Sequence, residues 1–156
     1  MNIKKKLYLA LPIILLIFFY VSYTIYNSYF YPRLITNKLS SLNKDNIINI
    51  YITSENSNAI NIDKNDIKYD EALSLLKELK NLKIGDTFSN NFKGTKIFYF
   101  HFETDSKDYL KQFTLVLYPS SNNIGILLNR GDLITFYPFL NEKSKVIVNN
   151  IILSLK

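Results

Sequence analysis

The sequence predicts an α+β protein: an N-terminal transmembrane helix, followed by a small domain with a mostly antiparallel sheet and about two helices. A long uncharged run follows a lysine cluster near the N-terminus. Several later segments alternate apolar and polar residues, and two others repeat apolar residues at helical spacing. Short polar turns separate the strands, so neighbouring strands should pair antiparallel, with the helices on one face of the sheet.

The uncharged run begins at Leu7 and ends at Ile25, a length of 19 residues. As a helix it would be ~28 Å long, which matches the hydrocarbon core of a bilayer. Tyrosines recur at helical spacing toward its end, as expected of aromatic side chains at a membrane–water interface. These tyrosines are Tyr20, Tyr23 and Tyr26. The lipid bilayer is therefore an expected partner of this chain.

Lys4, Lys5 and Lys6 directly precede the run and mark its cytoplasmic end by the positive-inside rule. We expect a single pass through the cell membrane, with the N-terminus in the cytoplasm and the C-terminal domain outside. A cleaved signal peptide is the alternative. The small residues that could end its cleavage motif, Ser22 and Ser28, each stand two positions after a tyrosine that is too large for such a motif. The chain has no cysteine, which excludes lipoprotein processing.

Three parts are expected along the chain. Residues 1–30 form the basic flank and the anchor, residues 31–46 a stalk or short helix, and residues 47–156 the extracytoplasmic α+β domain. The proline in Tyr31-Pro32-Arg33 is expected to break the anchor helix. The net charge of +6 owes three charges to the N-terminal lysines, and the other basic residues are interspersed with acidic ones. Without a basic stripe, no nucleic-acid partner is expected.

The first half of the domain begins with a strand. Ile48, Ile50 and Ile52 alternate with residues of the opposite face, and residues 59–62 are a candidate return strand. Residues 66–82 then form the clearest helical pattern, because their apolar residues keep a three-to-four spacing. Acidic residues lie near the start of this segment and lysines near its end, which suits the helix dipole.

The second half is mostly strands. Residues 97–103 alternate, with three phenylalanines on one face. Further strands are expected at residues 113–117, 124–129 and 133–139, separated by turn residues. Residues 145–155 repeat apolar residues at helical spacing despite their β-branched side chains, which favours a helix and leaves a strand as the alternative.

His101 is the one histidine of the chain, and Glu103 would project from the same strand face. A carboxylate beside an imidazole can raise its pKa and set its tautomer, as a general base requires. An envelope enzyme that uses His101 and Glu103 is therefore one hypothesis. We favour a pair without a catalytic role, because no nucleophile or third partner can be placed beside it. No glycine pattern that could cradle phosphates occurs, so no cofactor is expected.

An acidic cluster before and within the first turns of the helix over residues 66–82 invites comparison with a cation site. Its members are Asp63, Asn65, Asp66, Asp70 and Glu71. A calcium loop needs an oxygen ligand, a glycine and a final glutamate where this chain has Ile67, Lys68 and Ser74. The cluster therefore indicates the capped start of a helix, and no metal is expected.

Aromatic residues of the strand segments are the better candidates for a binding surface, because more rings are present than one face of a small sheet needs. The candidate binding patch consists of Tyr99, His101, Tyr137 and Phe139. The alternative is that these rings only complete the core. No single side chain in this set points to one ligand chemistry.

The lysine-flanked span, the strand Ile48-x-Ile-x-Ile, the helix over residues 66–82 and the aromatic hairpins together resemble small single-pass, membrane-anchored surface proteins of Gram-positive bacteria with AT-rich genomes. The resemblance implies a bacterial extracytoplasmic domain and no known reaction. We expect a membrane-anchored binding or interaction module without catalytic activity, with a protein or another envelope component as its partner. An immunity-type protein that protects against a secreted peptide or toxin is an alternative that shares the anchor.

Overall fold

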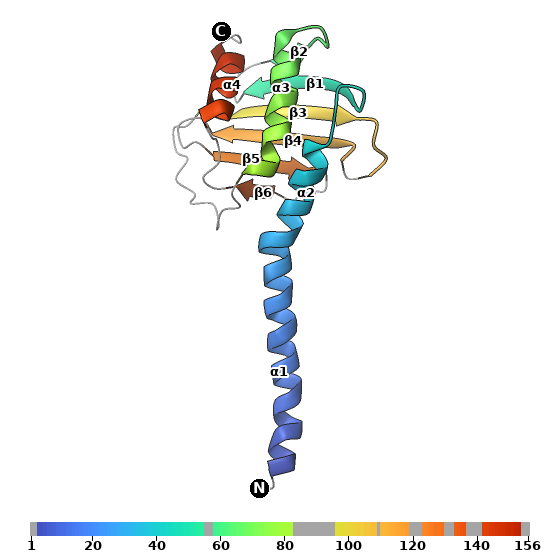
Figure 1. Cartoon of the computed structure of the whole chain (residues 1–156), viewed down its shortest axis with the longest axis vertical. Helices are drawn as coiled ribbons and strands as arrows, with labels where there is room; N and C mark the ends of the chain where they lie inside the picture. Colours follow the sequence, from blue (N-terminus) through green and yellow to red (C-terminus); the bar gives the residue numbers. More distant parts are fainter. Residues whose placement is uncertain are drawn as a thin grey trace.

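The structure is a computed structural model that describes residues 3–54, 58–82, 96–108, 110–118, 123–129, 133–136 and 142–153. It confirms the expected fold class: a long apolar N-terminal helix leads into an α+β domain with an antiparallel sheet and further helices. Figure 1 shows this helix projecting from the domain as one rod, with the other helices lying in front of the sheet.

The N-terminal helix extends further than the sequence predicts. α1 (Ile3–Ile25) continues through a π-helical turn, η1 (Tyr26–Phe30), into α2 (Tyr31–Ser40). The expected break at Tyr31-Pro32-Arg33 is therefore wrong. In a regular α-helix the Pro32 ring would collide with the carbonyl of Ser28, four residues earlier. Ser28 lies within the wider π turn, which the Tyr31 N–H closes by donating to the Tyr26 carbonyl, so the chain passes the proline without leaving the helix.

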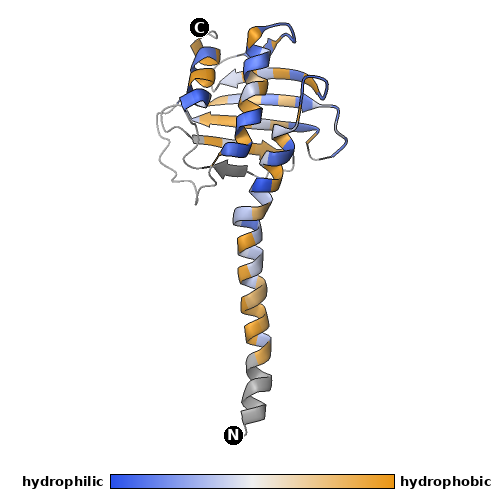
Figure 2. Ribbon diagram, viewed as in Figure 1, coloured by the Kyte–Doolittle hydropathy of each residue, from blue (hydrophilic) through white to orange (hydrophobic). Residues whose placement is uncertain are grey.

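Within the described residues, one helix is long and apolar enough to cross a membrane, over Leu11–Ser40. The domain covers none of the apolar window in this helix. Figure 2 shows the contrast, since hydrophobic residues dominate the projecting rod while the domain mixes hydrophobic and hydrophilic residues. A soluble core helix would instead have its apolar side chains covered by the rest of the protein.

Residues 31–46 were predicted to form a stalk or a short helix, and α2 lies within them. One side of α2 belongs to the domain's hydrophobic core. Ile35 and Leu39 are fully buried, whereas Leu34 on the outer side is 49% exposed. The Arg33 guanidinium adds a polar link by donating from Nη1 to the Lys80 carbonyl at 2.9 Å. The rod is thus joined to the domain through packed side chains as well as through the chain itself.

The described strands form one six-stranded sheet in the order β2-β1-β3-β4-β5-β6, with every neighbouring pair antiparallel. They are β1 (Ile47–Ser54), β2 (Ile60–Ile62), β3 (Phe98–Thr104), β4 (Gln112–Tyr118), β5 (Asn123–Leu128) and β6 (Leu133–Phe136). Each expected strand is present, although the part of the last one beyond residue 136 lies outside the described residues. β2 and β3 lie on opposite sides of β1 in the sheet. The connection from β2 to β3 therefore passes over β1, and α3 belongs to this connection.

Two helices follow the predicted pattern. α3 (Ile67–Glu78) starts where Asp66 accepts the Lys68 N–H at 2.9 Å, and it ends in a 3₁₀ turn, η2 (Leu79–Asn81). α4 (Glu142–Leu153) resolves the alternative for the last segment in favour of a helix. Its buried residues Ile147, Val148 and Ile151 face the core. β-Branched residues are tolerated there because packing outweighs their modest helix penalty.

The strand register divides the sheet into two faces with different tasks. The face toward the helices, called the helix face here, carries the core, in which Phe100, Phe102 and Leu115 are at most 1% exposed. The opposite face is called the open face; the core cluster does not include its residues. On β3, β4 and β5 the open face includes Tyr99, His101, Glu103, Thr114, Val116, Tyr118 and Leu127. The open face is not uniformly exposed, because on β4 Val116 is 4% and Tyr118 is 8% exposed, so this strand is buried on both faces.

The packing of α2 predicts that replacing its buried leucine and its exposed leucine will change the stability of the domain by different amounts. Leu39→Ala should lower the free energy of unfolding of the domain by about 2–5 kcal/mol, because it leaves a cavity in the core. Leu34→Ala is the matched control and should change it by no more than about 0.5 kcal/mol. Urea unfolding of the full chain in detergent micelles, followed by circular dichroism, measures both. Equal effects of the two changes would contradict the assignment of α2 to the core.

Candidate functional site

His101 lies near the middle of the open face, and three neighbouring side chains hold it there. Its cross-strand partners are Tyr51 on β1 and Thr114 on β4. Nδ1 of the imidazole lies 3.0 Å from the Thr114 hydroxyl, and Nε2 lies 2.9 Å from the hydroxyl of Thr53. Both ring nitrogens are therefore occupied by threonine hydroxyls, which can each donate or accept.

Two tyrosine rings flank the imidazole. The Tyr51 ring stacks on His101 with centroids 4.4 Å apart and planes 12° apart, and the Tyr99 ring lies 6.2 Å away at 22°. Tyr51, His101 and Tyr99 are called the aromatic row here. All three are half-buried, so the row is partly open to solvent. Stacking and hydrogen bonds together fix the imidazole in one orientation.

Burial lowers the pKa of His101 below its ordinary value of 6.5. The imidazole is therefore neutral at pH 7, with one nitrogen donating and the other accepting, a state that suits two hydroxyl partners. In the part of the chain that the structure describes, Glu103 makes no hydrogen bond or ion pair with His101. The hydroxyls of Thr53 and Thr114, rather than a carboxylate, are the hydrogen-bond partners of this imidazole, and they suit either tautomer because each can donate or accept.

A hollow of about 300 Å³ lies beside the aromatic row on the open face. Its lining comes from β1, β3, β4 and the end of β5, and consists of Tyr51, His101, Phe102, Glu103, Gln112, Phe113, Thr114, Leu127, Leu128 and Asn129. This volume lies at the lower end of the range for small-molecule sites. The hollow is thus large enough for one small group, and it is built on strands rather than on loops.

The structure brings together two of the four residues of the predicted binding patch, Tyr99 and His101. The other two, Tyr137 and Phe139, lie outside the described residues, so the full patch stays a prediction. Sequence reasoning missed Tyr51, Thr53 and Thr114 as neighbours of His101. The alternation of Ile50 and Ile52 already assigned Tyr51 and Thr53 to the opposite strand face, but only the register between β1 and β3 brings them to the histidine.

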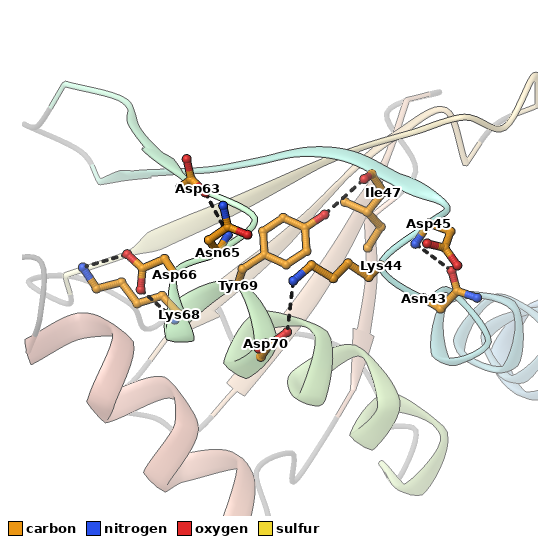
Figure 3. Close-up of polar contacts among 10 residues, drawn as sticks. All are labelled: Asn43, Lys44, Asp45, Ile47, Asp63, Asn65, Asp66, Lys68, Tyr69 and Asp70. Carbon is orange, nitrogen blue, oxygen red and sulfur yellow. Dashed lines mark hydrogen bonds and ion pairs between the residues drawn. The ribbon is translucent and has the colours of Figure 1, made fainter.

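The acidic cluster at the start of α3 is engaged in capping and pairing. Figure 3 shows Asp63 accepting the Asn65 N–H at 2.8 Å and Asp66 accepting the Lys68 N–H at 2.9 Å. The ammonium of Lys68 lies 3.8 Å from Asp66, and Asp70 pairs with Lys44, which lies in the turn between α2 and β1. Among the described residues no three acidic or histidine side chains gather in a way that could hold a metal ion. The expectation of a capped helix start is confirmed.

The three tyrosines predicted to lie at a membrane–water interface are found along the projecting helix. Tyr20, Tyr23 and Tyr26 are 72%, 69% and 51% exposed, and Ile25 is the last residue of α1. Lys4, Lys5 and Lys6, and Leu7 at the start of the predicted span, lie in the first turns of α1. The exposed aromatic side chains sit on the half of the rod that is nearer to the domain.

The lowered pKa of His101 predicts a pH dependence of stability. The unfolded chain binds a proton at His101 near pH 6.5, whereas the folded chain binds it only at lower pH, so the free energy of unfolding should fall as pH drops through 6.5. His101→Gln keeps a donor and an acceptor and should flatten this dependence between pH 7.5 and 5. Asp108, whose pKa a Ser106 hydrogen bond lowers, acts only at lower pH. Thermal unfolding of both proteins in micelles measures the effect, and an unchanged slope in the variant would contradict it.

The chain was compared with protein families, curated proteins and solved structures. The chain matches no protein-family model, no curated protein and no solved structure.

Proposed function

We propose that this chain is a single-pass membrane protein whose C-terminal domain stands outside the cell membrane and acts, without catalysis, as a binding module. The open face, with the aromatic row and the hollow beside it, is the binding surface of this proposal. The observation that carries it is the separation of two sets of aromatic side chains. One set fills the core on the helix face. The other, the aromatic row, lies on the face that the core does not use, where its members Tyr51 and His101 line the hollow.

The anchor part of the proposal is supported by apolar side chains that the domain leaves uncovered. Large side chains along residues 11–30 are exposed by about half or more, among them Leu16 at 69% and Phe19 at 66%. Burying one such side chain is worth about 1.5–3 kcal/mol, so a bilayer would stabilise this rod far more than water does. The lysine cluster before the span supports a cytoplasmic N-terminus, and the exposed tyrosines near the domain support an outer interface.

The binding part is supported by the rigidity and the exposure of the aromatic row. The imidazole of His101 has hydrogen-bond partners on both sides, so little conformational entropy remains to be lost when a partner docks against it. Half-buried tyrosines offer a large contact area with few rotatable bonds, which is typical of residues that dominate protein interfaces. The proposal therefore takes Tyr51 and Tyr99 as the centre of the contact.

An envelope hydrolase is a second candidate, and one observation favours it. The Thr53 hydroxyl lies 2.9 Å from His101 Nε2, and a neutral imidazole could accept its proton and activate it as a nucleophile. The other ring nitrogen meets the Thr114 hydroxyl rather than a carboxylate, which weakens the resemblance to a catalytic triad. Ester hydrolysis that is lost in Thr53→Val would favour this candidate over the binding module.

The orientation of the anchor can be measured directly, because the chain has no native cysteine. Asn2→Cys and Ile67→Cys each introduce a single thiol, the second at a side chain that is 73% exposed in the domain. In intact cells a membrane-impermeant maleimide should label the Ile67→Cys protein and leave the Asn2→Cys protein unlabelled until the membrane is permeabilised. The reverse labelling pattern would overturn the proposed orientation, and labelling of both thiols would argue against a membrane span.

The open face can be tested by site-specific photocrosslinking in intact cells. Replacing Tyr99 by p-azidophenylalanine keeps an aromatic ring in the row, and the same residue at Val146, 57% exposed on α4, serves as the control. We expect a discrete adduct from position 99, at least tenfold more abundant than any adduct from position 146. Equal yields at the two positions, or none at position 99, would contradict a binding role for the open face.

A further inference from the structure

The hollow on the open face has a simple construction. Three neighbouring strands each contribute three consecutive residues to its lining: residues 101–103, 112–114 and 127–129. The middle residues, Phe102, Phe113 and Leu128, turn their buried side chains toward the helix face and leave their backbone as the floor. The flanking residues rise on either side of this floor, so two rows of side chains form opposite walls.

The two walls differ in their polar groups. One wall consists of Tyr51, His101, Thr114 and Leu127, and its imidazole and threonine already bond to each other. The other wall consists of Glu103, Gln112 and Asn129. Within the described ranges no hydrogen bond or ion pair engages the side chains of these three residues. One wall is therefore aromatic and fixed, and the other offers polar groups that remain available to a ligand.

The charge and hydrogen-bonding capacity of the polar wall restrict the ligand class. Its carboxylate is the single charged group of the hollow, and no lysine or arginine lines the space among the described residues, which disfavours anions. Glu103 only accepts hydrogen bonds, whereas Gln112 and Asn129 both donate and accept. An ammonium group only donates and would leave the amide N–H groups unmatched. Hydroxyl groups donate and accept, and they match all three side chains.

We infer that the hollow binds one ring of an uncharged saccharide. The hydroxyls of the sugar bond to Glu103, Gln112 and Asn129, and its less polar face lies against the wall formed by Tyr51 and His101. The volume of about 300 Å³ is that of about ten water molecules in liquid water, which is enough for one sugar ring. The inference rests on the proposed binding role of the open face and adds the chemistry of its ligand.

Saturation-transfer NMR on the full chain in micelles tests this site. The probes are three neutral oligosaccharides, chitotriose, maltotriose and cellotriose, with trilysine as a cationic comparison. We expect saturation transfer to at least one oligosaccharide and a shift of the ring signals of His101, which are unambiguous because the chain has one histidine. Glu103→Gln and Gln112→Ala should each weaken this binding at least tenfold, since each change removes a hydrogen bond to the sugar and the one at Glu103 involves a charged group.

Glu142→Gln is the matched control, because the Glu142 side chain is 88% exposed on α4, away from the hollow, and the affinity should stay unchanged. Circular dichroism of each variant separates a lost site from a lost fold. No transfer to any of the three oligosaccharides, or transfer that survives Glu103→Gln, would overturn the saccharide inference. Trilysine binding that depends on Glu103 would also overturn it. These outcomes are distinct from failure of the proposed function, which the crosslinking yield at position 99 reports independently.

Discussion

The burial of Ile35 and Leu39 is the interaction on which the arrangement of this protein depends. These side chains belong at once to the helix that continues from the apolar rod and to the core of the domain. A flexible linker would let the domain turn freely about its tether. Here the packed side of α2 fixes the direction of the sheet relative to the rod, so the open face has a defined orientation with respect to the helix axis (Figure 1).

The helix face and the open face follow from the two-residue period of the strands. Once Ile50, Phe102 and Phe113 are committed to the core, their neighbours in sequence must project to the other side. The same register that aligns the core rows therefore aligns Tyr51, His101 and Thr114. The Tyr69 hydroxyl holds α3 against this sheet, because it donates to the Ile47 carbonyl at 3.1 Å at the start of β1 (Figure 3).

Local sequence patterns predicted most of the fold and part of the candidate site. The strands, α3 and α4 carry periodicities that act over a few residues, so single segments were enough to recognise them. The predicted apolar row of β1 was wrong at Ile48, which is 54% exposed, while Ile47 is buried in its place because the register shifts between Ile47 and Asn49. The continuity of the rod past Pro32 was missed, because it depends on how the preceding turn widens rather than on the proline itself. The neighbours of His101 were missed for a different reason. β1 and β3 are separated in sequence by β2 and α3, and no local pattern encodes their register.

The π-helical turn between α1 and α2 has a consequence for how this protein tolerates changes in length. Such a turn accommodates one residue more than an α-helical turn, while the helix beyond it keeps its angular phase. Loss of one residue within Tyr26–Phe30 can restore an α-helical turn. The rotation of the domain about the helix axis, relative to α1, then stays nearly unchanged. Loss of one residue inside α1 has no such buffer and rotates the preceding helix by about 100° relative to the domain. The direction of each side of α1 and the direction of the sheet are thus coupled along the whole rod, except at these five residues.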